Sequence, residues 1–214
     1  MLTPIVDYLR PNTPRPRFAV LADRDGVLIE ESDYLSDPAQ VRLLPCASHF
    51  VKSMRILGGL VAVVSNQSGV ARGLMTVSDV TEVNRALRQI LEDEGADLDA
   101  ILFCPHYPKG LVAEYSGECL CRKPKPGMFT ELTKHIVLSS IPLFVVGDRI
   151  TDVEFAHNIA ARACLVRTGV EQRSEEHLRA LLSPTDTVCA DLAETARWVE
   201  RNVTHATKQY DADR

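Results

Sequence analysis

Two aspartates stand two residues apart directly after a short apolar segment, in the sequence FAVLADRDGVLIE at residues 18–30. The apolar run Phe18–Ala22 is typical of a buried strand. Asp23 and Asp25 follow it, and two neighbouring buried carboxylates repel each other and lose hydration. A bound cation, or a reaction that uses both groups, explains the pair; a solvated acidic turn at a strand end is the alternative. Gly26 allows the backbone to turn sharply at this point.

Short apolar segments of strand length alternate along the chain with longer segments of helical apolar spacing. This alternation is typical of an α/β protein with a doubly wound parallel sheet. The strands are predicted at residues 18–22, 60–64, 100–103, 143–146, 162–166 and 187–189. The helices are predicted at residues 47–57, 77–93, 128–135, 152–160, 175–182 and 192–203.

These elements form one unit of residues 18–203, and the 214-residue chain suits a single domain with its own core. Residues 1–17 contain four prolines and are predicted to form an extended or loosely docked N-terminal arm. Residues 204–214 are predicted to form a flexible tail.

Charge and hydropathy exclude several classes of function. The net charge of −5 argues against a general nucleic-acid-binding protein. No apolar run approaches the length that spans a membrane, and residues 1–17 lack the pattern of a signal peptide. We therefore expect a cytoplasmic protein with no membrane partner. The lack of a sustained apolar surface stripe favours a monomer.

Polar side chains follow three of the predicted strands. Asp23 and Asp25 follow the first, Ser65 follows the second, and Asp148 follows the fourth. Ligands of doubly wound sheets bind at the carboxyl ends of the strands, so these groups are expected to share one crevice. Three carboxylates there require a cation, and an all-oxygen ligand set favours Mg²⁺. Asp152, one helical turn beyond Asp148, is expected to hold water on the metal or to orient its neighbours.

Basic side chains occur near the same segments, namely Arg24, Arg72, Arg122, Lys123 and Arg149. Carboxylates, Mg²⁺ and basic side chains together favour phosphoryl transfer. In this interpretation Asp23 attacks phosphorus and becomes an aspartyl phosphate. Asp25 protonates the leaving alkoxide and then takes a proton from the attacking water, which requires its pKa to exceed that of Asp23. Ser65 and the backbone N–H groups of Asn66 and Gln67 donate to phosphate oxygens, and Lys123 offsets charge.

The ordered set of these segments resembles the haloacid dehalogenase superfamily of phosphatases over about residues 18–203. The resemblance is carried by DRDGV, SNQSG, Lys123 and GDRITD. It implies a capless Rossmann-like fold in which Mg²⁺ is bound by Asp23, the backbone carbonyl of Asp25, and Asp148. It also implies that Asp23 is the nucleophile and Asp25 the acid/base.

A second metal site is predicted between residues 104 and 121, where three of the six cysteines lie near a histidine. The pattern is CxH, twelve intervening residues, and CxC, formed by Cys104, His106, Cys119 and Cys121. Three thiolates and one imidazole make a closed, structural zinc set, which suits a reducing compartment better than disulfides do. The alternative is that the cysteines are ordinary buried apolar residues. Zinc here would fix Arg122 and Lys123, which follow directly.

The zinc loop narrows the resemblance to the D-glycero-D-manno-heptose 1,7-bisphosphate 7-phosphatases. It is carried, in order, by DRDGV, SNQSGVARG, CPHYP, CLCRKPKPGM, VGDR and VRTG. The family acts on a small phosphorylated sugar, removing the 7-phosphate and leaving the 1-phosphate, on the way to nucleotide-activated heptose for a bacterial surface glycan. The resemblance implies a substrate site formed by Arg24, Glu31, Ser32, Asp33, Tyr34, Ser65, Asn66, Gln67, Ser68, Arg122 and Arg149.

The chain departs from the family at several of these positions. Ser65 replaces the usual threonine, Arg149 replaces the usual lysine, and residues 31–33 are atypical, so the sugar contacts are the least defined part of the resemblance. Histidinol-phosphate phosphatase shares the zinc loop, but the loop between its ligand pairs is shorter. A general small-molecule phosphatase and a catalytically silent, zinc-stabilised binding protein are further alternatives. The sequence does not specify the anomer at carbon 1.

Overall fold

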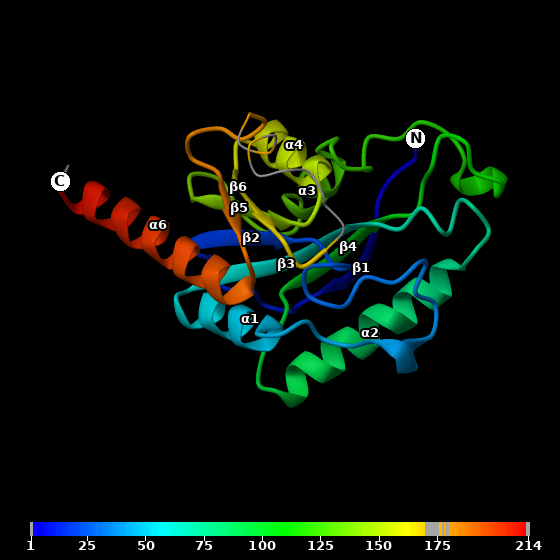
Figure 1. The fold of residues 1–214 in the computed structure, drawn as a ribbon, viewed down its shortest axis with the longest axis horizontal. Helices are drawn as coiled ribbons and strands as arrows, with labels where there is room; N and C mark the ends of the chain where they lie inside the picture. The colour runs from blue at the N-terminus through cyan, green and yellow to red at the C-terminus, as the bar shows by residue number, and fades with distance from the viewer. Residues whose placement is uncertain (1, 170–175, 177, 179, 213–214) are drawn as a thin grey trace.

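One sheet of seven strands organises the part of the chain that the computed structural model describes, residues 2–169, 176, 178 and 180–212, with side chains up to Thr204 (Figure 1). The strand order is β1-β4-β3-β2-β5-β6-β7. The strands are β1 (Ile5–Leu9), β2 (Phe18–Ala22), β3 (Gly59–Asn66), β4 (Ala100–Cys104), β5 (Leu143–Gly147), β6 (Arg162–Val166) and β7 (Thr187–Cys189). All neighbouring strands are parallel except β1, which pairs antiparallel with β4.

Helices cover both faces of the sheet, and this explains why β2 is apolar and buried along its whole length. The helices are α1 (Ala47–Ile56), α2 (Val77–Asp93), α3 (Gly127–Leu132), α4 (Ile150–Asn158) and α6 (Leu192–Ala212), with short 3₁₀ helices at Pro38–Gln40 and Ala113–Tyr115. Figure 1 shows α1 and α2 on one side of the sheet and α3 and α4 on the other. The first core contains Phe50 of α1, Leu87 of α2 and Trp198 of α6, and the second contains Met128 of α3 and Phe155 of α4. The predicted doubly wound α/β fold is therefore confirmed.

The chain order of the strands creates a crevice at the carboxyl end of β2. From β2 the chain moves to β3 and β4 on one side, and it returns to β5 and β6 on the other side. Loops after β2 and β5 consequently diverge at this switch point, where doubly wound sheets bind ligands. Most predicted elements agree with the structure to within a few residues. Of the helix predicted at 175–182, residues 176 and 178 are helical, and residues 175, 177 and 179 lie outside the described residues.

The two ends of the chain differ from expectation. Residues 5–9 of the predicted arm form the edge strand β1, because the apolar side chains of this short segment pack beside β4 while Pro4 and Pro11 lie outside the paired residues. The last helix continues from Val203, its predicted end, to Ala212, since residues 192–212 contain neither glycine nor proline to stop it. Within the described residues, no helix combines the length and the apolarity needed to cross a membrane.

Candidate functional site

A cavity of about 580 Å³ opens at the carboxyl ends of β2 and β3. Every residue predicted for catalysis or substrate binding lines it: Asp23, Arg24, Asp25, Glu31, Ser32, Asp33, Tyr34, Ser65, Asn66, Gln67, Ser68, Arg122, Lys123 and Arg149. The structure also adds side chains that the sequence did not single out, among them Glu118, Lys125 and Thr151. The cavity therefore gathers residues from four separate loops at one edge of the sheet.

Three carboxylates and one ammonium group lie together at the floor of this cavity. One oxygen atom from each of Asp23, Asp148 and Asp152 lies within 4.8 Å of the others. The Lys123 ammonium, which is buried, is 2.9 Å from Asp23 Oδ2 and 2.6 Å from Asp152 Oδ1. Lys123 thus bridges the end of β2 to the first turn of α4, and one positive charge faces three carboxyl groups.

The proton affinities at this floor follow from burial and charge. Burial raises the pKa of Asp152 to about 6, although Lys123 acts in the opposite direction. Burial by itself lowers the pKa of Lys123, but Asp152 and Asp23 together raise it above its usual value. Lys123 therefore stays charged at neutral pH and remains paired with the carboxylates.

Two glycines allow these carboxylates to approach the backbone. Gly26 has φ +74°, and a Cβ there would lie 2.7 Å from Asp148 Oδ2. A Cβ on Gly147 would lie 2.1 Å from the Cβ of Asp152, which packs against the end of β5. Larger residues at either position would push a carboxylate out of the group.

The donor set fits a hard divalent cation. The three carboxylates are almost fully buried, and buried carboxylates that close to one another are unfavourable without a compensating positive charge. Lys123 supplies only one such charge. Oxygen ligands at mutual distances of this size are those that Mg²⁺ accepts. The residues present therefore fit the magnesium ion predicted from the sequence.

Asp25 is held apart from this group by two neighbouring side chains. Arg24 donates from Nε to both carboxylate oxygens at 3.2 Å and from Nη2 to Oδ1 at 3.1 Å. Gln67 donates from Nε2 to Asp25 Oδ2 at 2.7 Å and to Ser65 Oγ at 2.8 Å. The Asp25 carboxylate is thus fixed in the cavity wall with its orientation set from both sides.

Arg24 and Asn66 have contacts that the predicted substrate role did not anticipate. Arg24 is only 1% exposed, and its guanidinium also donates to Asn84 Oδ1 at 2.9 Å. The Asn66 side chain makes a reciprocal pair with the main chain of Lys123, donating to its carbonyl at 3.1 Å and accepting from its N–H at 2.9 Å. Asn66 therefore fixes the position of Lys123 at the end of β3.

The rim of the cavity carries an ion pair between Glu31 and Arg149, 3.2 Å from Oε1 to Nη2. Burial is the main cause that raises the pKa of Glu31 from 4.5 to about 7, and Asp25 adds to it while Arg149 opposes it. Between pH 4.5 and about 7 the folded chain therefore keeps a proton on Glu31 that the unfolded chain has released. The stability that this protonated carboxyl contributes is fully present below the unfolded pKa. It is lost as pH rises through about 7.

Replacing Glu31 by glutamine should remove this contribution to the pH dependence of stability. Without added Mg²⁺, the thermal midpoint of Glu31→Gln minus that of the wild type should be larger at about pH 8 than at about pH 5. Scanning fluorimetry at the two pH values measures it, with Glu30→Gln, an exposed neighbour outside the cavity, as the control. Equal differences at both pH values would contradict the assigned burial effect.

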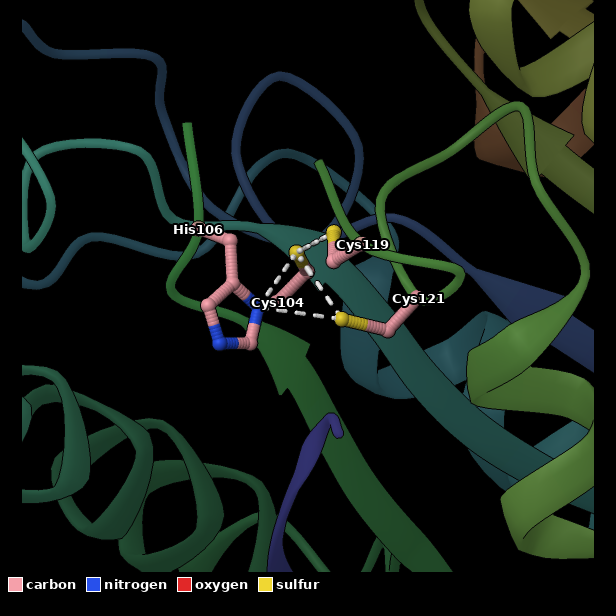
Figure 2. Close-up of side chains that lie close together, drawn as sticks. All are labelled: Cys104, His106, Cys119 and Cys121. Carbon is pink, nitrogen blue, oxygen red and sulfur yellow. Dashed lines mark hydrogen bonds between the residues drawn. The ribbon is translucent and has the colours of Figure 1, made fainter. Parts of the chain in front are cut away.

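A second group of metal-binding side chains lies at the end of β4 (Figure 2). His106 Nδ1 is 3.1 Å from the sulfur of Cys121 and 3.5 Å from that of Cys104. The Cys104 sulfur is 3.6 Å from that of Cys119 and 3.2 Å from that of Cys121. All four residues are buried, and each of the six cysteines, all of which lie among the described residues, is a free thiol.

These four residues fit zinc. Sulfurs bound to one zinc at about 2.3 Å would lie about 3.8 Å apart, slightly wider than the separations seen here. A hydrogen bond from Cys121 lowers the pKa of Cys104 and favours its thiolate, the form that binds metal, while the same contact raises the pKa of Cys121. All four positions of a tetrahedral ion would be taken by the protein, which leaves no position for water or substrate. The fit supports a structural site, as predicted.

The cysteine-rich loop also orders the basic residues beside the cavity. The Tyr107 ring contacts two guanidinium groups, with Arg72 Cζ 3.9 Å and Arg122 Cζ 5.4 Å from its ring centroid. Arg122 also donates to the carbonyl of His106 at 3.4 Å. The cation–π contact and this hydrogen bond hold Arg122 at the cavity wall. The sequence did not single out Tyr107, whose only signal was its position directly after His106.

Comparisons with known proteins give one consistent result. Residues 120–195 match the model of the HAD-hydrolase-like family. The chain is similar to the D-glycero-D-manno-heptose-1,7-bisphosphate 7-phosphatase of Thermosynechococcus vestitus, with 34% identity over 188 residues that cover 86% of this chain and 96% of that protein. It is 35% identical over 153 residues to the D-glycero-beta-D-manno-heptose-1,7-bisphosphate 7-phosphatase of Yersinia pestis, covering 71% of this chain and 81% of that one.

Solved structures agree with these relatives. The fold is similar to that of a HAD-like phosphatase from Mesorhizobium loti, with a TM-score of 0.78, 26% identity, and coverage of 94% of this chain and 95% of that one. It is also similar to D,D-heptose 1,7-bisphosphate phosphatase from B. bronchiseptica in complex with magnesium and phosphate. For that pair the TM-score is 0.73 and the identity 28%, covering 86% of this chain and 98% of the other.

Proposed function

The chain belongs to the D-glycero-D-manno-heptose-1,7-bisphosphate 7-phosphatase family, and from this premise we propose that it removes the 7-phosphate of that sugar bisphosphate. The observation that carries the proposal is the floor of the cavity, where Lys123 bridges Asp23 and Asp152 beside Asp148. A phosphate monoester needs such a mixture of carboxylate, cation and metal-binding oxygen for transfer.

In this proposal Asp23 is the nucleophile. Its carboxylate attacks phosphorus, the bond to the sugar oxygen breaks, and the phosphoryl group is carried as an aspartyl phosphate. Asp25, fixed by Arg24 and Gln67, gives a proton to the departing sugar oxygen. Water then attacks the aspartyl phosphate, Asp25 takes its proton, and free phosphate leaves with the Asp23 carboxylate restored.

The remaining residues of the floor bind and neutralise charge. Lys123 and Ser65 donate to the oxygens of the transferring phosphoryl group. Mg²⁺, held by Asp23, Asp148 and the carbonyl of Asp25, would act as a Lewis acid on that group and lower the repulsion of the incoming carboxylate. Asp152 keeps Lys123 in place through their 2.6 Å ion pair.

The second phosphate of the sugar needs its own positive charge. Arg122 and Arg149 also line the cavity, and Arg149 lies 3.9 Å from Asp148 Oδ1 and pairs with Glu31 at the rim; we assign both arginines to the 1-phosphate and sugar end of the substrate. Zinc in the cysteine loop would hold Arg122 and Lys123, which directly follow the ligand Cys121. The loop residues Ser32, Asp33 and Tyr34, which also line the cavity, complete the sugar side.

The proposal is tested by measuring phosphate release with Mg²⁺ from both anomers of heptose 1,7-bisphosphate and from histidinol phosphate. We expect kcat/KM for one or both anomers to exceed that for histidinol phosphate by at least about 100-fold. Only the bisphosphate carries a second phosphate that can pair with Arg122 and Arg149. Phosphorus NMR of the product should show one phosphate retained at carbon 1. Equal or better turnover of histidinol phosphate would contradict the proposal and favour the alternative phosphatase.

A further inference from the structure

We propose that the N-terminal strand β1 takes part in catalysis, with Asp7 as a positioning residue that sets the orientation of Asp25 through Asn84 and Arg24. The inference rests on the proposed role of Asp25 as the acid/base. It assigns a function to a segment whose sequence predicted only a loosely docked arm.

A continuous chain of hydrogen bonds, buried at Arg24–Asn84 and partly buried elsewhere, links β1 to the cavity. Thr81 Oγ1 donates to Asp7 Oδ1 at 2.7 Å, and Asn84 Nδ2 donates to Asp7 Oδ2 at 2.9 Å. Arg24 Nη1 then donates to Asn84 Oδ1 at 2.9 Å. The remaining donors of the Arg24 guanidinium face Asp25. The path therefore runs from an edge strand, through α2, to the carboxylate in the cavity wall.

Asp7 determines which way the Asn84 amide faces. A carboxylate can only accept hydrogen bonds, so it takes the amide NH₂ group and leaves the amide oxygen towards Arg24. A guanidinium can only donate, and therefore needs that oxygen. If the amide turned over, its NH₂ group would face the N–H groups of Arg24, and a buried cation would lose a partner.

Burial makes the hydrogen bond to Asn84 important for Arg24. The side chain is 1% exposed and Asn84 is 2% exposed, so water does not replace a lost hydrogen bond at either residue. Arg24 carries a full charge, and its guanidinium holds Asp25 with a fork of planar donors. A shift of this fork moves the carboxylate that must transfer the proton, and transfer rates depend steeply on such distances.

The backbone of β1 presents Asp7 for this role. Val6 pairs with Leu102 and Tyr8 pairs with the next residue, Ile101, so Asp7 is the extra residue of a bulge. Bulges of this kind re-aim a side chain out of the regular alternation of a strand.

The test compares Asp7→Ala with Asp97→Ala. Asp97 also tethers the N-terminal segment, through a 3.1 Å ion pair with Arg10, but it does not contact Arg24 or α2 in the described structure. Loss of either carboxylate removes a tether, but only loss of Asp7 removes the acceptor of the Asn84 amide and leaves Arg24 as its remaining side-chain partner in the described structure. Asp7→Asn is the conservative rescue, because its amide can accept from Asn84 and donate to the Thr81 hydroxyl.

We expect Asp7→Ala to lower kcat by about 10-fold while KM stays within about twofold of the wild type. Asp7→Asn should recover most of the loss, and Asp97→Ala should keep the wild-type kcat. A structural role would instead lower the thermal midpoint of both alanine variants and leave kcat per folded molecule unchanged. That result, or no recovery in Asp7→Asn, would overturn the inference.

A second readout does not depend on turnover. The guanidinium N–H protons of Arg24, identified in NMR spectra by their loss in Arg24→Lys, should exchange with water at least about 10-fold faster in Asp7→Ala and at the wild-type rate in Asp97→Ala. Unchanged exchange in Asp7→Ala would overturn the inference even if the enzyme is active. If Asp7→Ala shows the faster exchange but the wild type releases no phosphate from any ester, the hydrogen-bond path is supported and the proposed function alone is contradicted.

Discussion

Replacing Asp23 by asparagine should reduce turnover by about 10⁴-fold or more, because Asp23 is the only one of the three clustered carboxylates that lines the cavity in the described structure. The asparagine amide keeps the size of the carboxylate but cannot form the aspartyl phosphate. Steady-state phosphate release from the sugar bisphosphate, followed to long times at high enzyme concentration, measures the effect. Wild-type protein quenched in acid during turnover should also carry phosphate that hydroxylamine removes, and the variant should carry none.

The same variant should remain folded. Asp23 lies within 4.8 Å of Asp148 and Asp152, so its neutralisation relieves repulsion when no metal is added. The loss of its 2.9 Å ion pair with Lys123 opposes this gain, and Lys123 keeps its closer partner Asp152. The thermal midpoint should therefore stay close to that of the wild type. Activity above about 1% of wild type in a folded Asp23→Asn protein would contradict the covalent mechanism.

Replacing Cys121 by serine should cause the largest loss of stability. Purified wild-type protein should contain about one zinc per chain, and the variant should contain much less, because serine is a poor zinc ligand and binding of structural zinc contributes directly to folding. We expect the thermal midpoint to fall by about 10 °C, which corresponds to about 3 kcal/mol for a chain of this size. Metal analysis and scanning calorimetry measure the two effects.

Turnover should fall together with zinc in Cys121→Ser, since Arg122 and Lys123 follow the ligand directly. Cys46→Ser is the matched control, because Cys46 is an exposed free thiol outside the cluster. It should keep the metal, the midpoint and the activity of the wild type. A Cys121→Ser protein with normal zinc content, or a zinc-free wild type of equal stability, would contradict the structural zinc site.

Much of the candidate site was predictable because it depends on local patterns placed on a regular sheet. Asp23 and Asp148 directly follow apolar strands, Ser65 lies next to the last residue of another, and parallel strands bring their carboxyl ends to one edge. The ligand pattern around Cys104 and Cys121 is likewise local. In both cases the spacing along the chain and the handedness of the connections leave few alternative arrangements.

Roles that depend on burial and on distant partners were not predictable. Arg24, between two aspartates, suggested a contact with an anionic substrate, but its guanidinium points to Asp25 and Asn84. No sequence motif indicated a role for Tyr107, although its ring contacts the guanidinium groups of two arginines. Asp7 lay in a proline-rich arm that forms a strand only because the exposed edge of β4 is available to pair with it.

The sequence by itself determined the α/β class, the family, the cavity residues and both groups of metal-binding side chains. These follow from residue type and spacing, which act over a few residues or over one strand-to-strand connection. The tertiary structure alone decided which partner each buried polar group has, because a buried charge must be satisfied by whatever lies beside it in space. For this reason Lys123 joins Asp152 to Asp23, and the orientation of Asp25 depends on a residue of the first strand.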